Sequence, residues 1–218
     1  MEIRILKISL SMIGCLLAFT VQPAKAITVY SLSQGNSAIS GYPAPYGSAS
    51  VSLVGNTATF TFTAANTAAY QYLFGDGGSV GVNVNGAFTL GAITGTQLPG
   101  FGPTTYSNGG AGNEDGFGSF NLTINSSQGY TDASNSITFS IMGSWANEAS
   151  VLTANANGAL VAAHIFIAAF PADVHAGALT TGFAANGGAV NTPDGGTTAM
   201  LLGCALAGLG AMRRYLKR

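Results

Sequence analysis

The most regular feature of the chain is a set of short segments in which apolar and polar residues alternate. Residues 57–64 read TATFTFTA, and the same alternation occurs at 80–85, 119–125 and 137–141. Because successive side chains of a strand point to opposite faces, each segment predicts a β-strand with one buried face and one solvated face. Such strands are typical of antiparallel sheets.

Other segments complete the predicted fold. Residues 158–170 (GALVAAHIFIAAF) are apolar at nearly every position, which predicts a central strand buried on both sides. Asn85-Gly86 predicts a type I′ hairpin that leads into 87–90, and the glycine-rich residues 99–116 predict the longest loop. Together with the many Gly, Asn and Ser turns, these segments predict an all-β fold. We expect an antiparallel β-sandwich or jelly roll of about eight to ten strands.

Charge is distributed very unevenly. All seven Lys and Arg residues lie in the first 25 or the last 6 positions, so residues 27–192 contain no base. The same stretch contains six acids: Asp76, Glu114, Asp115, Asp132, Glu148 and Asp173. A formal charge of −6 repels nucleic acid. The lack of bases also removes phosphate clamps and Schiff-base lysines from the possible chemistry.

The N-terminus has the three parts of a secretory signal peptide. Arg4 and Lys7 precede an apolar stretch at 8–21, and Ala24 and Ala26 supply the spacing that signal peptidase requires. The apolar stretch is shorter than the ~20 residues of a membrane-spanning helix. We therefore expect residues 1–26 to be cleaved off after Ala26. Both cysteines of the chain lie outside 27–192, so no disulfide is expected in the exported domain.

The C-terminus also has three parts. A short motif at 192–196 (TPDGG) is followed by an uncharged apolar stretch at 197–212. As a helix this stretch measures about 24 Å, close to the ~30 Å of a bilayer core. A basic cluster then ends the chain: Arg213, Arg214, Lys217 and Arg218. These parts predict a single-pass transmembrane helix whose basic tail at 213–218 stays in the cytoplasm.

This order of parts resembles the PEP-CTERM sorting signals, and the VPDSG-CTERM variant in particular. Thr192 stands where that variant has Val, and Gly195 stands where it has Ser. The resemblance implies that an exosortase, a membrane-embedded protease, recognises Thr192, Pro193, Asp194, Gly195 and Gly196 and cuts near them. It also implies a cell-surface destination in bacteria that export polysaccharide. The expected organisation is a signal peptide at 1–26, a β-sandwich ectodomain at 27–170, an Ala/Gly/Asn-rich stalk at 171–191 and a sorting signal at 192–218.

Candidate chemistry is sparse. The turns at Asp76 and at Glu114-Asp115 offer carboxylates to Ca²⁺, although we expect these residues to be ordinary solvated turn acids, and no other metal or cofactor is expected. Glu114 and Glu148 could be the two carboxyl groups that glycoside hydrolysis requires. A domain with six acids offers such a pair by chance, so the pair by itself does not indicate an enzyme. Of the two histidines, His164 is expected in the core and His175 at the surface. The composition predicts that the protein is not an enzyme.

Aromatic residues leave one binding alternative open. Trp145 and five tyrosines form either a sugar-stacking platform or part of the core: Tyr42, Tyr46, Tyr70, Tyr72 and Tyr106. The expected function is a structural or adhesive role in exopolysaccharide or biofilm. The alternatives are a carbohydrate-binding module and, third, a polysaccharide hydrolase or lyase. The expected partners are signal peptidase, an exosortase, the membrane in passing, and extracellular polysaccharide.

Overall fold

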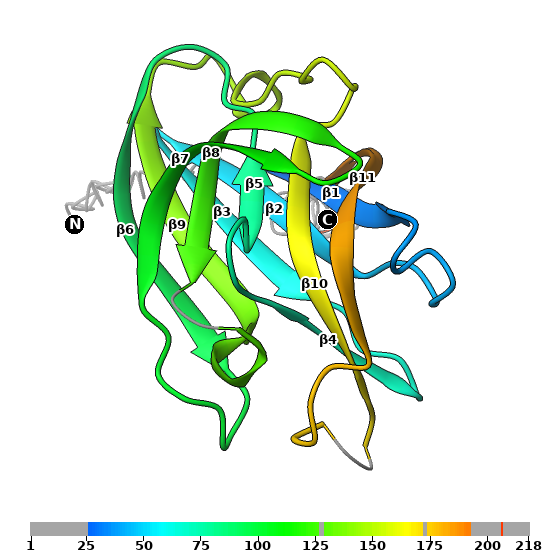
Figure 1. Ribbon diagram of the computed structural model, residues 1–218. Coiled ribbons are helices and arrows are strands. Elements are labelled where there is room, and N and C mark those ends of the chain that lie inside the picture. The colour runs from blue at the N-terminus through cyan, green and yellow to red at the C-terminus, as the bar shows by residue number, and fades with distance from the viewer. Residues whose placement is uncertain (1–25, 127–128, 172–173, 193–205, 207–218) are drawn as a thin grey trace, which may run out of the picture.

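The computed structural model describes residues 26–126, 129–171, 174–192 and 206, and within them the protein is built from antiparallel strands (Figure 1). The strands are β1 (Ile27–Gly35), β2 (Gly47–Val54), β3 (Thr57–Ala64), β4 (Tyr70–Phe74), β5 (Val80–Val82), β6 (Phe88–Gln97), β7 (Tyr106–Glu114), β8 (Gly118–Ser126), β9 (Ser134–Gly143), β10 (Val161–Ala169) and β11 (Thr180–Thr192). Two short 3₁₀ helices lie in connections between strands: η1 (Tyr130–Asp132) precedes β9, and η2 (Glu148–Ser150) follows it. The all-β prediction is therefore confirmed.

Hydrogen bonds join all eleven strands into one antiparallel sheet, in the order β11-β1-β2-β3-β9-β4-β10-β5-β8-β7, with β6 paired to β9. The long strand β11 pairs with β10 through its first half and with β1 through its second half. The sheet therefore turns back on itself, and Figure 1 shows its strands on opposite sides of a shared interior. The expected antiparallel sandwich or jelly roll is thus a single continuous sheet, in which β11 pairs with a strand on each side.

The core lies between the facing parts of the sheet. The predicted alternating segments at 57–64 and 137–141 form strands that point their apolar residues inward, as Phe60 and Phe62 of β3 and Phe139 of β9 show. The rings of Phe60 and Phe139 are stacked with centroids 4.9 Å apart. On the outer face of the same strands, the hydroxyls of Thr61 and Thr138 lie 3.2 Å apart. The sequence pattern thus predicted both faces of these strands correctly.

Three local predictions were wrong. Asn85-Gly86 does not close a hairpin, because β5 pairs with β8 and β10 whereas β6 pairs with β9. Residues 106–114, predicted as part of a loop, form β7 and pair with β8. Residues 180–191, predicted as part of a stalk, belong to β11. In the last two cases, backbone hydrogen bonds to a neighbouring strand stabilise segments whose small and polar side chains carry almost no strand signal.

Strand β10 positions the region described below. Val161, Ile165 and other inward residues of β10 contact the main core, and Ala162 and Phe166 point to the opposite face. That outer face is also covered. Ala162 packs with Phe120 of β8 in one small cluster, and Phe166 packs with Leu73 in another. The prediction of a strand buried on both sides is confirmed, and the β7–β8 hairpin is one of the elements that bury it.

Candidate functional site

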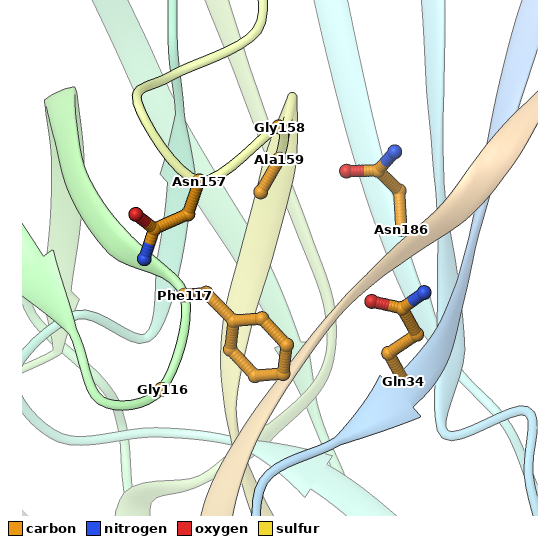
Figure 2. A pocket seen from close by; sticks show the side chains of 7 residues that line it. All are labelled: Gln34, Gly116, Phe117, Asn157, Gly158, Ala159 and Asn186. Carbon is orange, nitrogen blue, oxygen red and sulfur yellow. The ribbon is translucent and has the colours of Figure 1, made fainter.

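A cavity of about 400 Å³ opens where four segments meet over the outer face of β10 and β11. Gln34 comes from the end of β1, Phe117 from the β7–β8 turn and Asn186 from β11. Gly116 and residues 157–159, which precede β10, complete the wall. Figure 2 shows the ring of Phe117 between Asn157 on one side and Gln34 and Asn186 on the other. We call this cavity the amide pocket, after its three carboxamide side chains.

Irregular pairing of β1 and β11 places two of these amides in the pocket. Leu32 and Ala184 point into the main core, so regular alternation would send Gln34 and Asn186 inward as well. The register shifts between Leu32 and Gln34, where Asn186 lies opposite Leu32 and Ala185 lies opposite Gln34. A bulge of this kind re-aims side chains. Both amides therefore line the pocket on the outer surface.

The β7–β8 turn brings Phe117 to the pocket. Gly118 has φ of +85°, a conformation that glycine adopts without strain, and the N–H of Phe117 donates to the carbonyl of Glu114 over 2.8 Å. A Cβ added at Gly118 would lie 2.9 Å from Nδ2 of Asn157. Glycine at this position thus allows the turn and the 157–159 segment to approach each other closely.

Asn155 holds these two walls together. Its Nδ2 donates to the carbonyl of Phe117 (2.9 Å) and to that of Ser119 (3.1 Å). Its Oδ1 accepts from the N–H groups of Asn157 and Ala159, each at 3.0 Å. A second tie comes from Asn36, whose Nδ2 donates to the carboxylate of Asp115 over 3.1 Å. The shape of the pocket is therefore set by side-chain hydrogen bonds within the protein.

Replacing Asn155 by Ala should lower the free energy of unfolding by about 1–3 kcal/mol, because backbone groups in two loops lose their partner. Urea titration of the variant and the wild type measures the difference. Asn113→Ala is the matched control, since Asn113 is exposed and no side-chain hydrogen bond of it is found within the described part of the chain. The control should stay within about 0.5 kcal/mol of the wild type. Equal stabilities of Asn155→Ala and the wild type would contradict the assigned role.

The pocket amides themselves have free hydrogen-bonding capacity. Oδ1 of Asn186 accepts from the N–H groups of Leu160 (2.8 Å) and Val161 (3.2 Å), which leaves its Nδ2 without a protein partner in the described residues. The side chains of Gln34 and Asn157 make no hydrogen bond within residues 26–126, 129–171 and 174–192. The lining also carries no charge. The arrangement can hold a neutral polar ligand by donating and accepting hydrogen bonds.

Glu114 lies at the start of the β7–β8 turn but has no exposed surface. Its carboxylate contacts the backbone of Gly78, where an added Cβ would meet Oε1 at 2.5 Å. Neither carboxylate oxygen has a hydrogen-bond partner among the described residues. Burial therefore raises the pKa of Glu114 to about 8, so the group is mostly protonated at neutral pH.

This environment differs from the solvated turn that a Ca²⁺ ligand would occupy, and the side chain is closed off from any substrate in solution. A protonated carboxyl is a poor ligand for a hard cation, and the neighbouring Asp115 is exposed and bound to Asn36. In the part of the chain that the structure describes, no three His, Cys, Asp or Glu side chains converge to hold a metal ion. A polysaccharide also cannot reach Glu114 in this conformation, because the side chain is sealed from solvent.

The two histidines lie where they were predicted. His164 is 9% exposed, stacks on Phe183 with ring centroids 4.5 Å apart, and places Nε2 2.6 Å from the hydroxyl of Thr181. Burial lowers the pKa of His164, while the charge of Asp76 and the backbone of the adjoining glycines act in the opposite sense. His175 is exposed beside Phe101. Asp76 has φ of +66° in the β4–β5 connection.

Of the two alternatives left open for the six aromatic residues, the structure favours the core, because all six pack in the main core or against it. Tyr46 and Tyr72 are buried, and their hydroxyls donate to the backbone carbonyls of Ile39 and Pro43. Trp145 is half-buried and donates from Nε1 to the carbonyl of Asn85 over 2.7 Å. Tyr106 is half-buried against the core and bonded to Ser134. Phe117, the aromatic residue of the amide pocket, stands in the sequence between two glycines, without a pattern that would have singled it out.

The two ends of the described domain lie side by side. Ile27 opens β1, Thr192 closes β11, and the two residues are partners in the ladder. Of the residues at the predicted signal-peptidase site, the structure describes Ala26, and of the predicted sorting motif it describes Thr192. Ala24, the motif residues Pro193–Gly196, the transmembrane helix at 197–212 and the basic cluster lie outside the described residues, apart from Leu206. Within the described residues, no helix is long and apolar enough to cross a membrane.

Comparison with known proteins identifies the C-terminus. The family model described as VPDSG-CTERM motif matches residues 193–216, which confirms the predicted resemblance. The chain therefore carries a sorting signal of the PEP-CTERM type, which implies processing by exosortase-type machinery and a secreted, cell-surface-directed protein. No curated protein and no solved structure matches the chain.

Proposed function

We propose that the protein is an exosortase-processed component of the extracellular polysaccharide or biofilm matrix, with a structural or adhesive role and no catalytic activity. The observation that carries the proposal is the sorting motif at 193–216. In the precursor, the helix at 197–212 holds the chain in the membrane as a single-pass protein, and Arg213 and Arg214 set its depth. Release from this helix delivers the domain to the cell surface.

The fold supports this sequence of events. Every strand in the described part of the chain lies between Ile27 and Thr192, so removal of both terminal segments leaves this ladder intact. Because Ile27 and Thr192 are ladder partners, both segments leave the domain at the same edge. A membrane-bound processing enzyme therefore meets the motif directly next to a folded domain. A non-catalytic role agrees with the sealed carboxyl of Glu114 and with the absence of Lys and Arg from 27–192.

Replacing both Pro193 and Asp194 by Ala should abolish C-terminal processing, since these residues carry the motif's distinctive backbone and charge. The wild-type protein in extracellular material should begin near Ile27 and end within 192–196. The variant should stay in the membrane fraction and keep its basic tail. Mass spectrometry of terminal peptides, together with cell fractionation, measures both outcomes.

Asp173→Ala is the control, because it removes an acid upstream of β11 and leaves the motif unchanged. This variant should be processed and released like the wild type. A wild-type extracellular protein whose peptides reach Arg218 would overturn the proposed processing. Deletion of the gene followed by imaging of the matrix then tests the structural role.

A further inference from the structure

We propose that the amide pocket binds a neutral sugar unit of a polysaccharide. The inference deepens the proposed function and rests on it for its biological setting, since only an exported domain meets such a polymer. It does not rest on the aromatic platform considered from the sequence. The pocket instead combines three carboxamides, one partly exposed aromatic ring and no charge.

The hydrogen-bonding capacity of the lining matches the hydroxyls of a sugar. Each carboxamide offers a carbonyl acceptor and an NH₂ donor, and each sugar hydroxyl both donates and accepts. Gln34 and Asn157 have this capacity entirely free among the described residues, and Asn186 has its NH₂ group free. An apolar ligand would leave these groups buried without partners, which is unfavourable.

The ring of Phe117 supplies the apolar contact that a sugar also needs. One face of a pyranose exposes C–H groups, and an aromatic ring packs well against them. Phe117 is partly exposed and packs against the cluster formed by Phe120, Ala159, Ala162 and Ala185, which holds its position. Figure 2 shows the ring between the amides. The volume of about 400 Å³ lies near the lower end of the range of ~300–1,000 Å³ for small-molecule sites, which suits one or two sugar units.

Charge favours neutral sugars over acidic ones. The described lining carries no base, and residues 27–192 contain none, so a uronate or a phosphorylated sugar finds no cation. The nearest acid in sequence is Asp115, next to Gly116 of the lining, and its exposed carboxylate repels anions. A neutral hydroxyl-rich ligand is the class that satisfies the amides without an uncompensated charge.

The pocket is also held in shape before any ligand arrives. Asn155 ties the 157–159 segment to the β7–β8 turn, and Asn36 ties Asp115 to the end of β1. Binding then requires little ordering of loops, so more of the interaction energy appears as affinity. Repetition of the same sugar along a polymer would add avidity on a surface that displays many copies.

The test uses the full-length chain, solubilised in detergent where it is retained in membranes. This protein is applied to an array that carries neutral glucan, galactan and mannan oligosaccharides and, beside them, uronate-containing oligosaccharides. The neutral oligosaccharide that binds most strongly is then titrated to measure its affinity. The double variant Gln34→Ala with Asn157→Ala should lower its affinity at least about tenfold. Because these side chains make no hydrogen bonds in the described fold, thermal unfolding of the variant should match the wild type.

Asn56→Ala is the matched control, an exposed amide in the β2–β3 turn, at the end of β2 remote from the pocket. It should bind like the wild type. Three results would overturn the inference: no neutral oligosaccharide binds, the double variant binds as tightly as the wild type, or uronate-containing sugars bind better than neutral ones. These results are independent of the mass spectrometry above, so failure of glycan binding and failure of processing are distinguishable.

Discussion

Replacing Glu114 by Gln should remove most of the loss of stability that the wild type shows as pH rises from 4.5 to about 8. In the unfolded chain this carboxyl ionises near its ordinary pKa of 4.5, whereas in the folded protein burial raises the pKa to about 8. Between these values the folded state binds more protons, so its stability falls with rising pH. At about 1.4 kcal/mol for each tenfold change in proton affinity, the full loss is on the order of 5 kcal/mol.

Urea denaturation of both proteins from pH 4 to pH 9 measures this effect. Glutamine has nearly the same shape and cannot ionise, so the variant should be close to the wild type at pH 4.5 and several kcal/mol more stable above pH 8. Both proteins should also lose stability as pH falls below 6.5, because burial lowers the pKa of His164 in the folded state. Parallel curves between pH 4.5 and 8 would show that folding does not raise the pKa of Glu114.

Replacing Phe139 by Ala should cost about 3–5 kcal/mol of stability, which is enough to unfold a marginal domain. Phe139 is 1% exposed and stacks on Phe60 at 4.9 Å, where parts of the sheet that are distant in sequence share one core. Its strand β9 also pairs with β3, β4 and β6. Truncation therefore leaves a cavity at a point that several strands surround. Denaturant unfolding and near-ultraviolet circular dichroism measure the loss.

Met142→Ala is the control on the same strand. Met142 follows the buried Ile141 but points outward and is 57% exposed, so its truncation should change stability by no more than about 0.5 kcal/mol. A similar loss in both variants would mean that strand propensity, and not core packing, dominates at β9. A negligible loss for Phe139→Ala would contradict the packing described for the core.

Sequence periodicity predicted the strands whose two faces differ. Phe60 and Phe139 lie inward because their neighbours are small polar residues, and a strand places such alternating residues on opposite faces. It also predicted the buried strand around His164. Periodicity did not predict β7 or β11, whose glycines, alanines and asparagines have no apolar face. Their stability comes from ladder partners far away in the chain, which a local pattern does not contain.

By itself, the sequence determined the destination of the protein and the class of its fold. The motif at 193–216, the placement of every Lys and Arg and the alternating strands are all local features, and each acts through residues that are adjacent in the chain. Only the tertiary structure decided the candidate site. Gln34, Phe117, Asn157 and Asn186 come from four separate segments, and a register shift aims two of them outward. Such convergence depends on strand pairing between distant residues, and no local pattern encodes it.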